Sequence, residues 1–144
     1  MNGQKLGSCD ALPSVLPADS ESRKKIPIFS GAISYFPRAV AAISAVCFVG
    51  NEKHNPGEPL RWVRDKSHDH TDCVMRHLID AHESTVTAPC GARLGVAVDP
   101  VTGIPEAVFA AWRAMAHAEL VLEHLAKQSR ASIPGRRCDK VDGE

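Results

Sequence analysis

The residues from Ser67 to about Glu83 place charged and apolar side chains on opposite sides of one helix. A helix turns by about 100° per residue. Five charged residues therefore fall within an arc of roughly 80°, and they are Asp69, Asp72, Arg76, Asp80 and Glu83. Three apolar residues fall opposite them, namely Val74, Leu78 and Ala81. With Ser67 as a favourable capping residue, this pattern predicts an amphipathic helix that packs through one face only.

Two further helices are predicted on either side of it. The first begins near Ser34–Pro37 and ends near Gly50, and the last begins at Pro105 and ends near Ser129. Proline suits a first turn, and apolar residues follow at helical spacing. We expect a loop over residues 55–66 and a loop or hairpin insertion over residues 84–104. Three such helices bury a thin core, so the expected fold is an all-α bundle completed by homo-oligomerisation.

Composition limits the class of protein. The 17 basic residues balance the 17 acidic ones, so bulk charge does not predict binding to a nucleic-acid polymer or a membrane surface.

Pro-, Ser- and Asp-rich residues 1–24 are expected to be a flexible arm, residues 25–129 the domain, and residues 130–144 a disordered tail. We expect no signal peptide or membrane span. Five cysteines without a C-x-x-C pair indicate a reducing, cytoplasmic compartment.

Three carboxylates of the central segment form a candidate site for a divalent metal ion. Asp69 and Asp72 are three residues apart on the predicted helix, so both can reach one ion. Glu52 can join them if the preceding helix packs antiparallel. Mg²⁺ and Mn²⁺ prefer carboxylate oxygens, and an ion relieves the repulsion among clustered carboxylates. The alternative is a solvated polar face without a metal.

The same segment offers basic residues and histidines for other chemistry. Lys53, Lys66 and Arg76 are candidate phosphate ligands. The alternative for Arg76 is an ion pair with Asp72 or Asp80. A zinc site would draw on residues that scatter around the helix, namely His68, His70, Cys73, His77 and His82. Of these, His70 and His77 lie toward the core-facing flank. A His-Asp phosphohydrolase site would use His54, His68, Asp69 and either Asp80 or Asp99. The separation between His54 and His68 is short for such a site.

The chain from Lys24 to about Leu125 resembles the phage dATP/dGTP diphosphohydrolases (MazZ-like), a divergent branch of the MazG-like all-α nucleotide pyrophosphohydrolases. The matching features are GNEKHNPG at 50–57, Trp62 with Lys66-Ser67, DHTD at 69–72 and RHLIDA at 76–81. PEAVFAAWRAMAHAEL at 105–120 resembles the family's closing helix. Glu52 stands at the last glutamate of the MazG motif E-E-x-x-E, whose earlier two positions hold Phe48 and Val49. Asp69-x-x-Asp72 stands for E-x-x-D.

The resemblance implies a Mg²⁺- or Mn²⁺-dependent enzyme that hydrolyses dGTP or dATP to the monophosphate and pyrophosphate. It implies metal ligands at Glu52, Asp69 and Asp72, with Asp80 in place of a missing carboxylate, and a water-orienting role for Glu52 or Asp72. The substrate contacts that it implies are Lys53, Lys66 and Arg76 for the phosphates and Asn55 and Trp62 for the base. Supplying dGMP to a phage with 2-aminoadenine DNA is the role that it suggests.

Two alternatives stay open from the sequence. A His-Asp-type dNTP triphosphohydrolase would release the nucleoside and intact triphosphate. A non-catalytic helical phage accessory protein would keep the fold and lose the site, and the two missing MazG-type glutamates favour it.

Overall fold

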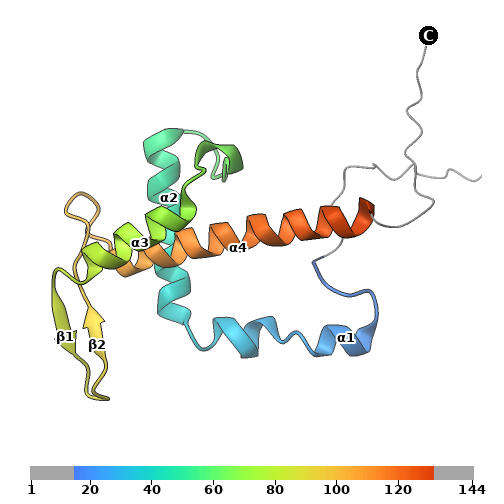
Figure 1. Cartoon of the computed structure of the whole chain (residues 1–144), viewed down its shortest axis with the longest axis horizontal. Coiled ribbons are helices and arrows are strands. Elements are labelled where there is room, and N and C mark those ends of the chain that lie inside the picture. The colour runs from blue at the N-terminus through green and yellow to red at the C-terminus, as the bar shows by residue number, and fades with distance from the viewer. Residues whose placement is uncertain (1–14, 132–144) are drawn as a thin grey trace, which may run out of the picture. The chain divides into compact units, whose positions relative to one another are not determined.

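The computed structural model describes residues 15–131, which form four helices and one small hairpin (Figure 1). The order along the chain is α1 (Ser20–Lys24), α2 (Pro37–His54), α3 (His70–Ala81), β1 (Thr85–Thr87), β2 (Arg93–Gly95) and α4 (Glu106–Ala131). A π-helical turn at Phe29–Ile33 precedes α2, and a 3-10 turn at Arg64–Lys66 precedes α3. The expected all-α class is confirmed, with the hairpin as its one departure in the described residues.

The chain divides into two compact units. One is Pro27–Ala118, which holds α2, α3, the hairpin and the first half of α4. The described part of the other is residues 15–26 and 119–131. Here α1 lies inside the predicted flexible arm, where Asp19 caps it by accepting a hydrogen bond from the Ser22 N–H at 2.8 Å. The rest of that arm, and the predicted tail from residue 132 onward, lie outside the described residues.

Side-chain contacts tie the three helices of the larger unit together. Trp112 of α4 donates from its indole Nε1 to Cys47 Sγ of α2 at 2.9 Å. His77 of α3 lies 2.7 Å from a carboxylate oxygen of Glu106, the first residue of α4. In Figure 1, the axis of α2 runs steeply across the axes of α3 and of the first half of α4. These contacts join segments far apart in sequence, so the packing depends on tertiary structure rather than on local propensity.

Helix α3 begins later and turns a different face inward than its apolar pattern predicts. It starts at His70, with Asp69 at the capping position, and Ser67 instead donates to Asp69 Oδ1 at 3.0 Å. Its buried residues are His70, Cys73 and Ala81, whereas Leu78 is 40% exposed. Of the predicted inner face, Ala81 is buried and Val74 is half-buried, but Leu78 is not buried. The side chains that contact α4 are those of His70, against Trp112, and His77, against Phe109.

The hairpin expected between residues 84 and 104 is confirmed, and it packs against the end of α3. Its strands pair antiparallel with Val86 opposite Leu94. The Ala97 N–H then donates to the carbonyl oxygen of Ala81, the last residue of α3, at 3.2 Å. A Cβ atom at Gly95 would lie only 2.6 Å from that same carbonyl oxygen. Glycine is therefore required at this position by a close approach of two backbones.

We predict that Gly95→Ala lowers the free energy of unfolding by about 1–3 kcal/mol, because the added methyl group overlaps backbone that cannot rotate away. Thermal or urea unfolding followed by circular dichroism measures the change. The matched control is Gly50→Ala, where a Cβ in the interior of α2 meets nothing within 4 Å. That control should raise stability by about 0.5–1 kcal/mol through helix propensity. Equal effects at the two positions would contradict the close approach.

The core of the described chain is small. Its buried apolar residues are Val46, Cys73, Ala81, Ala110 and Ala116. Large apolar side chains stay exposed, among them Phe29, Tyr35, Phe36, Phe48 and Leu122. Homo-oligomerisation, which would cover such residues, stays a prediction that sedimentation can test.

None of the described helices is by itself both long and apolar enough to cross a membrane. The segments Ser20–Ile33 and Pro37–His54 meet that criterion only when they are taken together.

Candidate functional site

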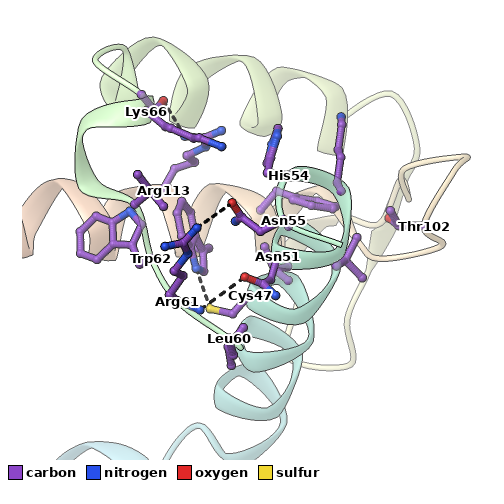
Figure 2. A pocket seen from close by; sticks show the side chains of 18 of the residues that line it. Cys47, Asn51, His54, Asn55, Leu60, Arg61, Trp62, Lys66, Thr102 and Arg113 are labelled. Atoms are coloured by element: carbon purple, nitrogen blue, oxygen red, sulfur yellow. Dashed lines mark hydrogen bonds between the residues drawn. The ribbon is translucent and has the colours of Figure 1, made fainter. Parts of the chain in front are cut away.

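A pocket of about 1040 Å³ opens in the unit formed by residues 27–118. Its walls come from α2, the loop 55–67, α3, the turn 99–102 and α4 (Figure 2). Its size is that of a site for a nucleotide-sized or cofactor-sized ligand. Fourteen of the lining residues lie between Val49 and His77.

A buried amide of α2 holds the loop that forms the near wall. Asn51 is 5% exposed, and its Nδ2 donates to the carbonyl oxygen of Glu58 at 2.9 Å. Its Oδ1 accepts a longer hydrogen bond from the Arg61 N–H, at 3.4 Å. Arg61 in turn reaches Asn55 Oδ1 at 3.5 Å, which Figure 2 shows across the middle of the pocket. Asn51 therefore positions the backbone that carries Arg61 and Trp62.

Two tryptophans form an aromatic wall. Trp62 of the loop and Trp112 of α4 meet edge to face, with ring centroids 6.1 Å apart. The Arg64 guanidinium lies 4.5 Å from the centre of the Trp62 ring, and that of Arg113 lies 5.3 Å from the Trp112 ring. Such cation–π contacts stiffen both sides of the wall. Flat aromatic surface of this kind suits stacking on a base.

Positive charge dominates the lining. Lys53, Arg61, Lys66 and Arg113 all contribute to the pocket, with His54 beside them. Arg113 is held in place by donating from Nη1 to Ser67 Oγ at 2.8 Å. Four cations around one cavity favour an anionic ligand, and arginine can bind a phosphate through two hydrogen bonds.

Asp99 is the carboxylate among the lining residues. Its Oδ1 accepts hydrogen bonds from the Thr102 N–H at 2.7 Å, the Thr102 hydroxyl at 2.8 Å and the Val101 N–H at 3.2 Å. The bonds from Thr102 lower the pKa of Asp99 below its usual value. Asp99 is therefore an ionised group whose charge is largely satisfied by its own turn.

A buried histidine in the pocket wall lacks hydrogen-bond partners. His70 is 4% exposed, and neither of its ring nitrogens has a partner in the described chain. Its ring lies 6.4 Å from that of Trp112. Burial, followed by the nearby Arg113, lowers the pKa of His70. A neutral imidazole with two unsatisfied nitrogens is costly in a folded protein, so it points to a ligand or water that completes it.

The structure divides the predicted substrate-binding residues into two groups. Lys53, Asn55, Trp62 and Lys66 all line the pocket. Arg76 does not, because it donates to Asp69 Oδ2 at 2.7 Å and to Cys73 Sγ at 2.9 Å. Hydrogen bonds from Arg76, then from Cys73 and Ser67, hold the pKa of Asp69 well below its usual range. Arg76 and Asp69 thus form an exposed ion pair with each other.

The four predicted metal ligands do not converge. Glu52 lies in the last turn of α2 and Asp72 in the first turn of α3, both are exposed, and neither lines the pocket. Within residues 15–131, the three-residue group with the spacing of a metal site is His77, Asp80 and Glu106, whose ligand atoms lie within 4.8 Å of one another. Asp80 is thus the predicted ligand that joins it. The zinc set contributes His77 to this group and the His-Asp set contributes Asp80, and the other members of the two sets do not join it.

Sequence reasoning named His77 for zinc and Asp80 for Mg²⁺ or Mn²⁺, but it missed Glu106 as a ligand. His77 and Asp80 have the i,i+3 spacing that brings side chains together on a helix, and that signal was present in RHLIDA. Glu106 lies 29 residues from His77 along the chain, so no local spacing brings the two together. Its burial, at 8% exposed, depends on α3 and on the hairpin that precedes α4.

Comparison with known proteins gives one match. A family model described as dATP/dGTP diphosphohydrolase, N-terminal, matches residues 17–130. No curated protein and no solved structure matches the chain significantly. The match covers α1 to α4 and every residue of the pocket lining.

Proposed function

Since the chain belongs to the dATP/dGTP diphosphohydrolase family, we propose that it hydrolyses a purine deoxynucleoside triphosphate to the monophosphate and pyrophosphate. The observation that carries the proposal is the pocket with four cations beside two tryptophans. A triphosphate requires clustered cations, and a purine requires flat apolar surface. Both are present in one cavity that is large enough for the whole molecule.

The basic residues would hold and orient the phosphate chain. Arg61 and Arg113 offer paired N–H donors, and Lys53 and Lys66 offer mobile point charges. Arg113 is already fixed by Ser67 and by its position over Trp112, so less freedom is lost when it binds phosphate. We propose Trp62 and Asn55 as contacts to the base, with Asn55 at the end of α2 and Trp62 in the loop that follows it.

Hydrolysis at phosphorus needs a group that orients water. We keep Glu52 and Asp72 as candidates for this role, and we add Asp99 because it lines the pocket as a carboxylate. A bound Mg²⁺ or Mn²⁺ would neutralise the charge that develops on the phosphates. His77, Asp80 and Glu106 fit such an ion by residue type and mutual spacing. Preference for dGTP over dATP would support a role in supplying dGMP for modified phage DNA.

The proposal predicts which bond breaks. With Mn²⁺ or Mg²⁺, dGTP or dATP should give its monophosphate and pyrophosphate in equal amounts, and chromatography of the products measures this. Lys66→Met should raise KM at least tenfold through loss of a phosphate contact. Lys127→Met, an exposed lysine outside the pocket, is the control and should leave KM unchanged.

Two outcomes would overturn the proposal. Free deoxynucleoside with tripolyphosphate would favour the His-Asp-type triphosphohydrolase and direct attention to His54, His68 and Asp69. No turnover of any of the four dNTPs, in a protein whose circular dichroism shows folded helices, would favour the non-catalytic accessory protein.

A further inference from the structure

We propose that His77, Asp80 and Glu106 form a binding site for a divalent transition-metal ion, and that the site takes Mn²⁺ in preference to Mg²⁺. The inference deepens the proposed function, on which it rests for the ion's purpose, but the site itself is argued from contacts alone. Of the four carboxylates that the sequence suggested, it keeps Asp80, and it adds His77 and Glu106.

The geometry of the three side chains is close to that of a coordinated ion. Metal–ligand bonds to histidine and carboxylate are about 2.0–2.2 Å long, so ligand atoms around one ion lie within roughly 4.4 Å of one another. The three groups already lie within 4.8 Å. Asp80 is exposed, and its carboxylate has no hydrogen bond or ion pair among the described residues. A change in its rotamer is therefore enough to close the remaining distance.

Two of the three ligands are already held in place. The His77 ring stacks on Phe109 of α4, with centroids 5.2 Å apart and planes inclined by 20°. Stacking fixes the plane of the imidazole and leaves its nitrogens at the ring edge, where Nδ1 lies 2.7 Å from Glu106 Oε2. Glu106 is fixed at the start of α4, where its N–H donates to the Ala97 carbonyl oxygen at 3.0 Å. Pre-organised ligands lose little freedom when an ion binds.

The burial of Glu106 favours a cation at this place. Its side chain is 11% exposed, and the paired His77 side chain is 27% exposed. A buried carboxylate is destabilised unless positive charge and hydrogen bonds compensate it. The N-terminal end of α4 supplies only a partial positive charge beside it. The contact between His77 and Glu106 does not compensate the negative charge of Asp80. A divalent ion would compensate the charges of both Glu106 and Asp80.

An independent feature shows that the adjoining cavity is built for a ligand. His77 lines the same pocket as His70, whose two buried nitrogens have no partner. An ion at His77, Asp80 and Glu106 would therefore lie beside the cavity that holds the lysines and arginines. The arrangement places a metal at one edge of a phosphate-binding pocket.

The kind of ligand selects the kind of metal. Mg²⁺ prefers oxygen ligands and holds its waters tightly. Imidazole nitrogen suits transition metals, and carboxylates suit Mn²⁺. One histidine with two carboxylates therefore predicts at least tenfold tighter binding of Mn²⁺ than of Mg²⁺.

The test is Mn²⁺ binding to the full chain after removal of metal by a chelator. The loss of the electron paramagnetic resonance signal of free Mn²⁺ measures binding, and the metal-dependent rise in melting temperature provides a second readout. Asp80→Asn and Glu106→Gln should each weaken Mn²⁺ binding at least tenfold. Glu83→Gln, an exposed carboxylate just beyond the end of α3, is the matched control and should bind as the wild type does.

Each outcome decides between the site and the proposed function. Wild-type Mn²⁺ affinity in Glu106→Gln, or no Mn²⁺ binding by the unaltered chain, would overturn the site. Asp80 is exposed, so Asp80→Asn gives a folded variant even if Glu106→Gln does not. Mn²⁺ binding without any dNTP hydrolysis would reject the proposed function and leave the site. Hydrolysis that neither substitution slows would reject a part for the site in the reaction and leave the proposed function.

Discussion

Asn51→Leu is expected to lower the free energy of unfolding by about 2–4 kcal/mol and to reduce dNTP turnover at least tenfold. Leucine has a similar volume but removes both hydrogen bonds of the buried amide. The Glu58 carbonyl oxygen and the Arg61 N–H are then left without the partners that they have here. Leaving a buried polar group unpaired costs about 1–3 kcal/mol. The loop would also lose the contact that places Arg61 and Trp62 in the pocket.

The measurement is urea unfolding together with steady-state kinetics on the same preparation. Ser44→Ala is the control, because Ser44 lies on the same helix and its exposed hydroxyl bonds only the Val40 carbonyl oxygen one turn earlier. That variant should change stability by less than about 0.5 kcal/mol and leave kinetics unaltered. If Asn51→Leu unfolds like the wild type, the amide does not anchor the loop.

His70→Leu should change stability and nucleotide binding in opposite directions. The wild-type imidazole is buried with both nitrogens unsatisfied, so an apolar residue of similar size removes a destabilising group. We expect the free protein to gain about 1–3 kcal/mol. If the pocket binds a nucleotide whose polar groups complete His70, the same change should weaken that binding at least tenfold. A binding site that is unsatisfied when empty commonly shows this opposition.

The same variant should alter the response to acid. Arg113 and His117 of α4 and Asp69 and His68 before α3 surround His70, and burial makes the largest contribution to its lowered pKa. Below about pH 6.5, the ordinary histidine pKa, His70 binds a proton in the unfolded chain but stays neutral in the folded chain. Folding stability therefore falls as the pH drops from there to the pKa of folded His70.

Melting temperatures from pH 8 to pH 5 test both statements. The wild type should lose more stability than His70→Leu across this range, and His68→Gln, which alters an exposed neighbour, should follow the wild type. Identical pH profiles for the wild type and His70→Leu would show that His70 titrates normally. A fall in the stability of His70→Leu at pH 8 would show that the imidazole has a polar partner after all.

The helices could be predicted from the sequence because their signals are local. Pro37 is the first residue of α2 and Pro105 immediately precedes α4, and apolar residues recur at helical spacing after each. The sequence also located part of the pocket lining, since the predicted contacts Lys53, Asn55, Trp62 and Lys66 all lie in it. Local pattern thus located the helices and part of the pocket wall.

The ligand sets could not be predicted in this way, because they depend on contacts across the chain. His70 is buried against Trp112, and His77 meets Glu106, in both cases between α3 and α4. Asp69 lies on the charged arc of the helix, and only the structure shows that Arg76 forms an ion pair with it. Spacing predicts which residues share a face, whereas the partner of that face is fixed by tertiary packing.

Placing both tryptophans of the sequence in a single wall gives the protein a built-in optical reporter. The chain contains two, Trp62 and Trp112, and their rings meet edge to face beside the basic residues. Indole emission responds to the charges, hydrogen bonds and solvent around the ring, which here include two guanidinium groups and the Cys47 sulfur. The intrinsic fluorescence of the unlabelled chain therefore reports on the cavity, without a background signal from tryptophans elsewhere.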